Sequence, residues 1–251
     1  MKTGLALSGG GAKGIAHAGV LKALKQHDVQ IHKIAGTSAG ALIGALYAAN
    51  IDIDDIYEFF RSSNLFHPSK FAFGQPGFIK SNVFIDHISS YIPVNSFESL
   101  KLPLIVAATD LNNAKLKLFD SGELYMAILA SAAFPGVFTP VSIGDNVYID
   151  GGVINNFPID LLDDCDIKLG SYVNKIEPLN KKMKHSYDVA GRAYSISQYH
   201  RDSSKFYQAD LMFEPEELYP FGLFSFRSLR KMFNIGYENA SRQLDKSLLF
   251  K

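Results

Sequence analysis

Within its first 50 residues the chain passes twice from a short apolar stretch through a loop of small residues into a helical pattern. The stretch at 3–9 leads through three glycines into apolar residues at helical spacing over 14–28. The stretch at 31–38 leads into an alanine-rich pattern at 39–50. Strands and helices in this alternation build a parallel sheet covered by helices on both faces. The sequence therefore predicts an α/β fold, and its length suits a single domain spanning 1–251.

The rest of the chain continues the alternation less regularly, with no internal repeat or linker. Further strands are expected at 102–111, 115–120, 146–152, 166–173 and 210–215, and further helices at 125–133, 183–208 and 225–249. The last part, about 183–251, is therefore expected to be mainly helical.

Composition excludes several classes of function. The 25 basic residues balance the 25 acidic ones, so no net positive field favours binding to nucleic acid. The only cysteine, Cys165, excludes an internal disulfide framework and a cysteine-rich zinc site. The acidic segment 51–56 lacks the central glycine and closing glutamate of a calcium loop. We expect no metal and no cofactor.

The apolar run at the N-terminus is too short for the core of a signal peptide. This predicts a cytoplasmic protein. No window reaches the roughly 20 apolar residues that cross a bilayer. Any membrane contact is therefore expected to be peripheral, at the inner membrane surface.

The segment "SGGGAKG" at 8–14 follows a strand pattern and opens a helical one. A helix N-terminus in this setting exposes unpaired N–H groups, which suit a negative charge. The charge can be a dinucleotide phosphate or a reaction oxyanion, and a tight turn alone is a third interpretation. A dinucleotide site requires an acidic residue at the end of the second strand, where this chain has Thr37 and Ser38. A P-loop requires a lysine at the position of Ile15. These departures favour the oxyanion.

The segment "GTSAG" at 36–40 sets Ser38 at the junction of a predicted strand and helix. A serine on such a sharp turn, with glycines two residues away on each side, is typical of a nucleophile. A serine helix cap is the alternative. The glycine loop would lie beside Ser38 at the carboxyl edge of the sheet, and this pairing favours the nucleophile.

A base for Ser38 is not obvious among the histidines. They are His17, His27, His32, His67, His87, His185 and His200, and none follows a strand in a glycine-flanked loop. Asp150 ends a predicted strand and is followed by two glycines, although an Asp-Gly turn is a common structural feature. A carboxylate with a pKa of about 3.9 is a poor base for a hydroxyl, so a serine–aspartate dyad needs a sheltered pocket.

Together these segments resemble the patatin-like phospholipases of bacteria. Four motifs match in order: "GGGAKG" at 9–14, "GTSAG" at 36–40, "ASAAFPGVF" at 130–138 and "DGG" at 150–152. The matched region covers about 4–160, and the C-terminal helical part matches only loosely.

The resemblance implies a three-layer α/β/α sandwich with a mostly parallel sheet, and a Ser-Asp dyad. It implies Ser38 as nucleophile, Asp150 as general base, and Gly9, Gly10 and Gly11 as the oxyanion-hole loop. It also implies supporting positions in the motifs: Lys13, Gly14, Gly36, Gly40, Ser131, Pro135, Gly151 and Gly152. For Lys13, loop support and a contact to the substrate headgroup both stay open.

The expected activity is that of a phospholipase A or lysophospholipase acting on acyl esters in lipid degradation or remodelling. A broad carboxylesterase, an acyltransferase and a nucleotide-binding protein that uses the glycine loop are the alternatives. The phenylalanine-rich segment 59–78 fits an acyl-chain channel or lid, or equally a part of the core.

Overall fold

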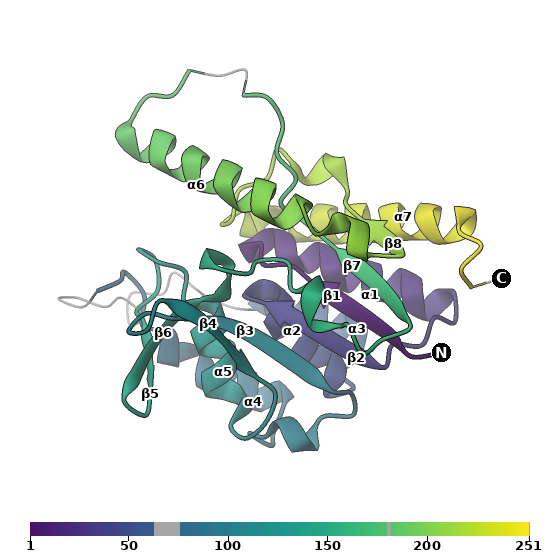
Figure 1. Ribbon diagram of the computed structural model, residues 1–251, viewed down its shortest axis with the longest axis horizontal. Helices are drawn as coiled ribbons and strands as arrows, with labels where there is room; N and C mark the ends of the chain where they lie inside the picture. The colour runs from purple at the N-terminus through teal and green to yellow at the C-terminus, as the bar shows by residue number, and fades with distance from the viewer. Residues whose placement is uncertain (63–75, 180–181, 251) are drawn as a thin grey trace.

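The computed structural model describes residues 1–62, 76–179 and 182–250, and its centre is a mixed β-sheet (Figure 1). The strands lie in the order β5-β6-β3-β2-β1-β7-β8, and β4 pairs with β3 off this path. Their bounds are β1 Thr3–Leu7, β2 Lys33–Thr37, β3 Leu104–Asp110, β4 Lys115–Phe119, β5 Val141–Ile143, β6 Asn146–Asp150, β7 Ile167–Ser171 and β8 Leu211–Phe213.

One face of the sheet carries the larger hydrophobic core. Leu5, Leu7, Ile34 and Val106 point into it and pack against apolar side chains of α1 to α5 and α7. The helices are α1 Ile15–Gln26, α2 Ala39–Ala48, α3 Ile53–Ser62, α4 Ile85–Tyr91, α5 Leu124–Ala132, α6 Ser186–Ser203 and α7 Leu229–Lys246.

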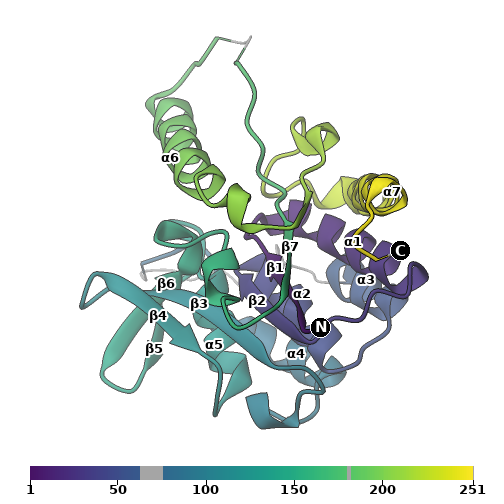
Figure 2. The ribbon, with the colours of Figure 1, turned by 45° about the vertical axis from the view of Figure 1, so that its right-hand side comes forward.

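The opposite face of the sheet has a thinner cover. Ala6 and Ala35, which alternate with the residues of the larger core, contact a second cluster that contains Phe157 and Tyr172. The loop after β6 and the end of α6 supply most of this layer, and Figures 1 and 2 show the start of α6 standing away from the sheet. The three layers are therefore of unequal thickness.

The predicted α/β class is confirmed. The sheet is parallel across β3, β2, β1, β7 and β8, whereas β4 and β6 run antiparallel to β3, and β5 antiparallel to β6. The sequence patterns do not predict β5 or α4, because both are short and carry little periodicity.

The strands β2 and β6 reach the same edge of β3 from opposite ends. β2 is parallel to β3, with Thr37 opposite Ala107, and β6 is antiparallel, with Asp150 opposite Ala108. β4 pairs with both Ala107 and Ala108, so it occupies the other edge. The carboxyl ends of β2 and β6 therefore meet beside two consecutive residues of β3.

Candidate active site

Ser38 occupies the turn between β2 and α2, with a backbone φ of 54°. A residue with a Cβ rarely adopts this left-handed conformation unless its surroundings hold it there. The Ser38 N–H donates to the hydroxyl oxygen of Ser131 over 2.8 Å, and that hydroxyl donates to the carbonyl of Ala107 over 2.6 Å. The motif at 130–138 thus contacts the serine turn through the buried side chain of Ser131.

The glycines on either side of Ser38 allow α2 to approach the sheet closely. A Cβ on Gly40 would lie 2.2 Å from the carbonyl oxygen of Leu7, and a Cβ on Gly36 would lie 2.7 Å from the backbone of Ala41. A larger residue at either position would push α2 and the serine turn away from β1.

Asp150 ends β6 and is 3% exposed. Its Oδ1 accepts from the N–H of Gly152 over 2.7 Å, and its own N–H donates to the carbonyl of Ala133 over 3.0 Å. Burial raises the pKa of the Asp150 carboxyl to about 6, against the lowering effect of hydrogen bonds from the Ser38 side chain and the Gly152 N–H. The Ser38 and Asp150 side chains therefore face one another where β2 and β6 meet.

The glycine loop lies beside this pair. The Gly9 N–H donates to the carbonyl of Asn156 over 3.1 Å, whereas the N–H groups of Gly10 and Gly11 have no acceptor within the described residues. Gly11 has a φ of 56°, and a Cβ there would lie 2.5 Å from the carbonyl oxygen of Leu223. Two unpaired donors next to a serine hydroxyl can bind an oxyanion.

A buried histidine anchors the start of this loop. The carbonyl of Ser8 accepts a hydrogen bond from Nε2 of His17 over 2.8 Å, and the Ser171 hydroxyl donates to Nδ1 over 2.7 Å. Burial lowers the pKa of His17 to about 4, so the ring is neutral near pH 7. His17 is a packed structural residue and does not contact Ser38.

Lys13 is also buried, with 9% of its surface exposed, and lines a cavity beside Ser38. Its ammonium has no hydrogen-bond or ion-pair partner in the part of the chain that the structure describes. Burial lowers the pKa of Lys13 to about 8. The side chain is therefore available to a ligand.

The remaining motif positions pack around the site. Gly14 lies against Ala39 at the start of α2, and Gly151 against the carbonyl of Ala107. Pro135 lies in an exposed turn after α5 and lines neither cavity that adjoins Ser38, whereas its neighbour Phe134 lines one of them.

A polar cavity of about 260 Å³ opens beside Ser38 and Asp150. Its walls carry the cationic side chains of Lys13, Lys175 and Arg192, and Asp150 is the only carboxylate among the described lining residues. Lys175 is paired with Glu216 and lies 3.8 Å from Glu214, so Lys13 and Arg192 are the cations that favour an anionic group here.

An apolar pocket of about 120 Å³ also adjoins Ser38. Its lining includes Leu42, Phe59, Phe84, Ile88, Ile128 and Phe138, from α2 to α5 and the turn after α5. Of the phenylalanine-rich segment, Phe59 and Phe60 are buried in α3 and line this pocket, and Phe78 is 70% exposed. The other phenylalanines of that segment, within 63–75, lie outside the described residues.

The sequence motifs miss the C-terminal contribution to the site. Arg192 and Gln198 come from α6, and Lys175 follows β7. Asn156 lies close enough to the "DGG" motif that the pair "NN" at 155–156 could have drawn attention to it. The α6 residues carry no comparable local signal.

Across the described residues no group of three or more His, Cys, Asp or Glu side chains is arranged to hold a metal ion. The helices described there include none of the length and apolar character that a membrane span requires.

Comparison with known proteins finds relatives that align with a little under two thirds of the chain. An uncharacterised NTE family protein of Mycobacterium tuberculosis is 34% identical over 164 residues, covering 63% of this chain and 44% of that protein. Lysophospholipase NTE1 of Debaryomyces hansenii is 30% identical over 162 residues, covering 62% of this chain and 10% of that protein. The chain thus spans less than half the length of these curated relatives.

Solved structures extend the likeness to the C-terminal part. VipD from Legionella pneumophila matches with a TM-score of 0.60 at 15% identity, covering 97% of this chain and 66% of that chain. A chain of the SpcU–ExoU complex from Pseudomonas aeruginosa matches with a TM-score of 0.50 at 13% identity, covering 99% and 53%. At such identities the likeness concerns the fold alone. A family model for patatin-like phospholipases matches residues 5–163, more than half of the sequence, and the chain therefore belongs to the patatin-like phospholipase family.

Proposed function

We propose that the protein is a serine acyl hydrolase that cleaves fatty-acyl esters of phospholipids or lysophospholipids. One observation carries the proposal: Ser38, Asp150 and two unpaired N–H groups of the glycine loop lie together where an apolar pocket and a cationic cavity adjoin. A phospholipid ester has an apolar chain, a carbonyl and an anionic headgroup in this spatial order.

In the first half of the reaction the Ser38 hydroxyl attacks the ester carbonyl, and Asp150 accepts the hydroxyl proton. The N–H groups of Gly10 and Gly11 donate to the oxyanion that forms. The tetrahedral intermediate collapses, the carbon–oxygen bond to the alcohol breaks, and Asp150 returns the proton to that alcohol. The product is an acyl-enzyme on Ser38.

In the second half Asp150 accepts a proton from water, which attacks the acyl-enzyme. The second oxyanion uses the same N–H donors. On its collapse the bond to Ser38 Oγ breaks and Asp150 returns its proton to that oxygen, which releases the fatty acid and restores the free enzyme. A base with a pKa of about 6 suits both steps near neutral pH, because it is ionised there yet is more basic than an exposed carboxylate.

The two cavities give the substrate one orientation. We place the acyl chain in the apolar pocket and the headgroup in the polar cavity, where Lys13 and Arg192 would face its phosphate. The family match and the name of the lysophospholipase relative support a phospholipid substrate. Such a reaction serves lipid degradation or remodelling, through a peripheral contact with the inner membrane surface.

The test incubates a bacterial phospholipid extract with wild type, Ser38→Ala, Asp150→Asn and the control Ser142→Ala, which changes an exposed serine of β5. Mass spectrometry follows free fatty acids and lysolipids. We expect release by wild type and by Ser142→Ala only, because the other two variants lack the nucleophile or the base.

Release by Ser38→Ala at the wild-type rate would overturn the assignment of the nucleophile. An added alcohol acceptor separates hydrolysis from acyl transfer, since a transferase would yield an acylated acceptor in place of free fatty acid. Activity on neutral short-chain esters with no release from phospholipids would identify a carboxylesterase.

A further inference from the structure

The helix α6 joins the rest of the domain through its last turns. Among its described side chains Asp202 alone is buried, and its first turns are largely exposed. Figures 1 and 2 show these first turns standing away from the sheet, whereas the end of α6 approaches the loop after β6. Tyr199 packs against Tyr172 at this end, and two groups of polar contacts reach residues of the candidate active site.

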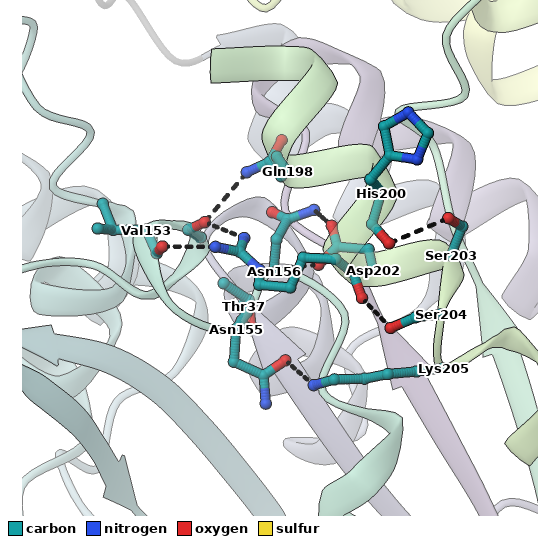
Figure 3. Close-up of polar contacts among 12 residues, drawn as sticks. Thr37, Val153, Asn155, Asn156, Gln198, His200, Asp202, Ser203, Ser204 and Lys205 are labelled. Atoms are coloured by element: carbon teal, nitrogen blue, oxygen red, sulfur yellow. Dashed lines mark hydrogen bonds and ion pairs between the residues drawn. The ribbon is translucent and has the colours of Figure 1, made fainter. Parts of the chain in front are cut away.

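The first contact is made with the turn that follows Asp150. The guanidinium of Arg201 donates to the carbonyl of Val153 over 2.6 Å and to that of Gly152 over 2.8 Å. The Gln198 amide donates to the Gly152 carbonyl as well, over 3.2 Å (Figure 3). Charge-assisted bonds from a planar fork fix both the position and the direction of these carbonyls.

The second contact is made with the glycine loop, through one intermediate residue. The carboxylate of Asp202 accepts from the Asn156 amide over 3.0 Å (Figure 3). It also accepts from the Tyr172 hydroxyl over 3.1 Å. The carbonyl of Asn156 in turn accepts the N–H of Gly9 over 3.1 Å. The orientation of Asn156 therefore sets where the glycine loop begins.

Two consecutive residues of α6 are thus linked to the two halves of the site. Their side chains are also linked to each other, since Nε of Arg201 lies 3.6 Å from Oδ1 of Asp202. A carboxylate that is fully buried needs such partners to offset its desolvation. Asp202 is therefore buried at a cost in desolvation that a surface helix does not require for its own folding.

We propose that Arg201 and Asp202 are positioning residues, which hold the Asp150 turn and the glycine loop at the separation that the reaction needs. The inference rests on the proposed function, because it concerns the same reaction. Arg201 acts through Gly152, whose N–H donates to the Asp150 carboxylate. Asp202 acts through Asn156 on the loop that carries the oxyanion donors.

The test compares Arg201→Gln and Arg201→Lys with wild type on a soluble short-chain ester, so that lipid binding does not enter. The control is Arg242→Gln, which removes an arginine of α7 that lies 3.6 Å from Glu217 far from the dyad. We expect kcat of Arg201→Gln to fall by up to about 100-fold, as a misplacement of reacting groups by 1 Å can do, with little change in KM. Arg201→Lys keeps the positive charge and one donor group, so its kcat should lie between those of wild type and Arg201→Gln.

The pH profile separates positioning from simple destabilisation. Loosening of the Gly152 turn weakens a hydrogen bond that lowers the pKa of Asp150, so the acid limb of kcat should move to higher pH in Arg201→Gln. A loss of folding alone would lower the melting temperature and the active fraction but leave the limb in place. Tyr194, Lys13 and Arg192 line the same cavity as Asp150. Burial raises the pKa of Tyr194 to about 12 and lowers that of Lys13 to about 8, so neither titrates in the range of the acid limb.

The outcomes for this inference and for the proposed function differ. If Ser38→Ala hydrolyses the ester as fast as wild type does, the proposed function is overturned, and the inference with it. Serine-dependent hydrolysis, combined with wild-type kcat and an unmoved acid limb in both Arg201 variants, would overturn the inference alone. If Arg201→Gln does not fold, Arg201→Lys decides between these outcomes by the same two readouts.

Discussion

Burial adjusts the Asp150 carboxyl towards the role of general base that we propose for it, a role that an exposed carboxylate performs poorly. The side chain accepts only a few hydrogen bonds, and desolvation raises its pKa to about 6. A base of this strength is largely ionised at neutral pH and can still take a proton from a hydroxyl in a transition state. His17 follows the glycine loop closely in the sequence and is buried and neutral. Both of its ring nitrogens are already hydrogen-bonded, to Ser8 and Ser171.

The raised pKa of Asp150 predicts the pH dependence of activity. Protonated Asp150 cannot accept the proton of Ser38, so kcat/KM should fall about tenfold per pH unit below pH 6. A steady-state profile on a soluble ester between pH 4 and pH 9, buffered at constant ionic strength, measures this limb. A limb near the pKa of an exposed aspartate, or no limb, would contradict Asp150 as the base.

The same carboxyl should make the free energy of unfolding fall as pH rises, whereas it makes activity rise. The folded-state pKa lies above the unfolded value of 3.8, so stability from the neutral carboxyl is full below pH 3.8 and lost as pH rises through about 6. Asp150→Asn should therefore abolish activity yet unfold at a higher urea concentration than wild type at pH 8, by up to about 3 kcal/mol. The gain should shrink towards pH 4.

At the scale of elements, α1 and α7 pack so closely that glycines are required on both. A Cβ on Gly236 of α7 would lie 2.1 Å from the carbonyl oxygen of Ala16, and a Cβ on Gly19 of α1 would lie 2.1 Å from that of Phe233. This contact attaches the last helix of the chain to the first one. It also brings the 219–226 loop, which precedes α7, over the glycine loop.

Gly236→Ala should destabilise the protein by about 1 to 3 kcal/mol, because it forces two helix backbones apart. Gly191→Ala is the matched control, since no atom lies within 4 Å of a Cβ at that position of α6. There the higher helix propensity of alanine should add up to about 1 kcal/mol. Urea unfolding of the two variants tests this, and equal midpoints would refute the close packing of α1 and α7.

At the scale of the whole molecule, the C-terminal third completes the sheet as well as the site. β7 pairs with β1 in the centre of the sheet, and α7 covers α1. A fragment of residues 1–163, which corresponds to the family match, would expose the edge of β1 and the apolar face of α1. We expect such a fragment to aggregate and to show no cooperative thermal transition by circular dichroism, unlike the full chain. A soluble, cooperatively folded fragment would contradict this.

The sequence predicted the α/β class and the main elements because strand and helix periods are local signals. It also singled out Ser38, Asp150 and the glycine loop, which lie in short motifs at element ends. The contacts of Arg201 and Asp202 could not be predicted in the same way. They join segments 30 to 49 residues apart, through side chains on a helix whose exposed turns give no clear amphipathic pattern.

The meeting of β2 and β6 at one edge of β3 also determines which parts of the chain can change during evolution. The spacing of Ser38 and Asp150 is set by the register of these strands. The described residues between α2 and β3 contribute apolar walls, such as Phe59, Phe84 and Ile88, and none of the proposed reacting groups. Mutations there can therefore accumulate without disturbing the chemistry. If the proposed reaction holds, lineages that inherit this sheet are free to diverge in the acyl chains they accept while keeping that reaction.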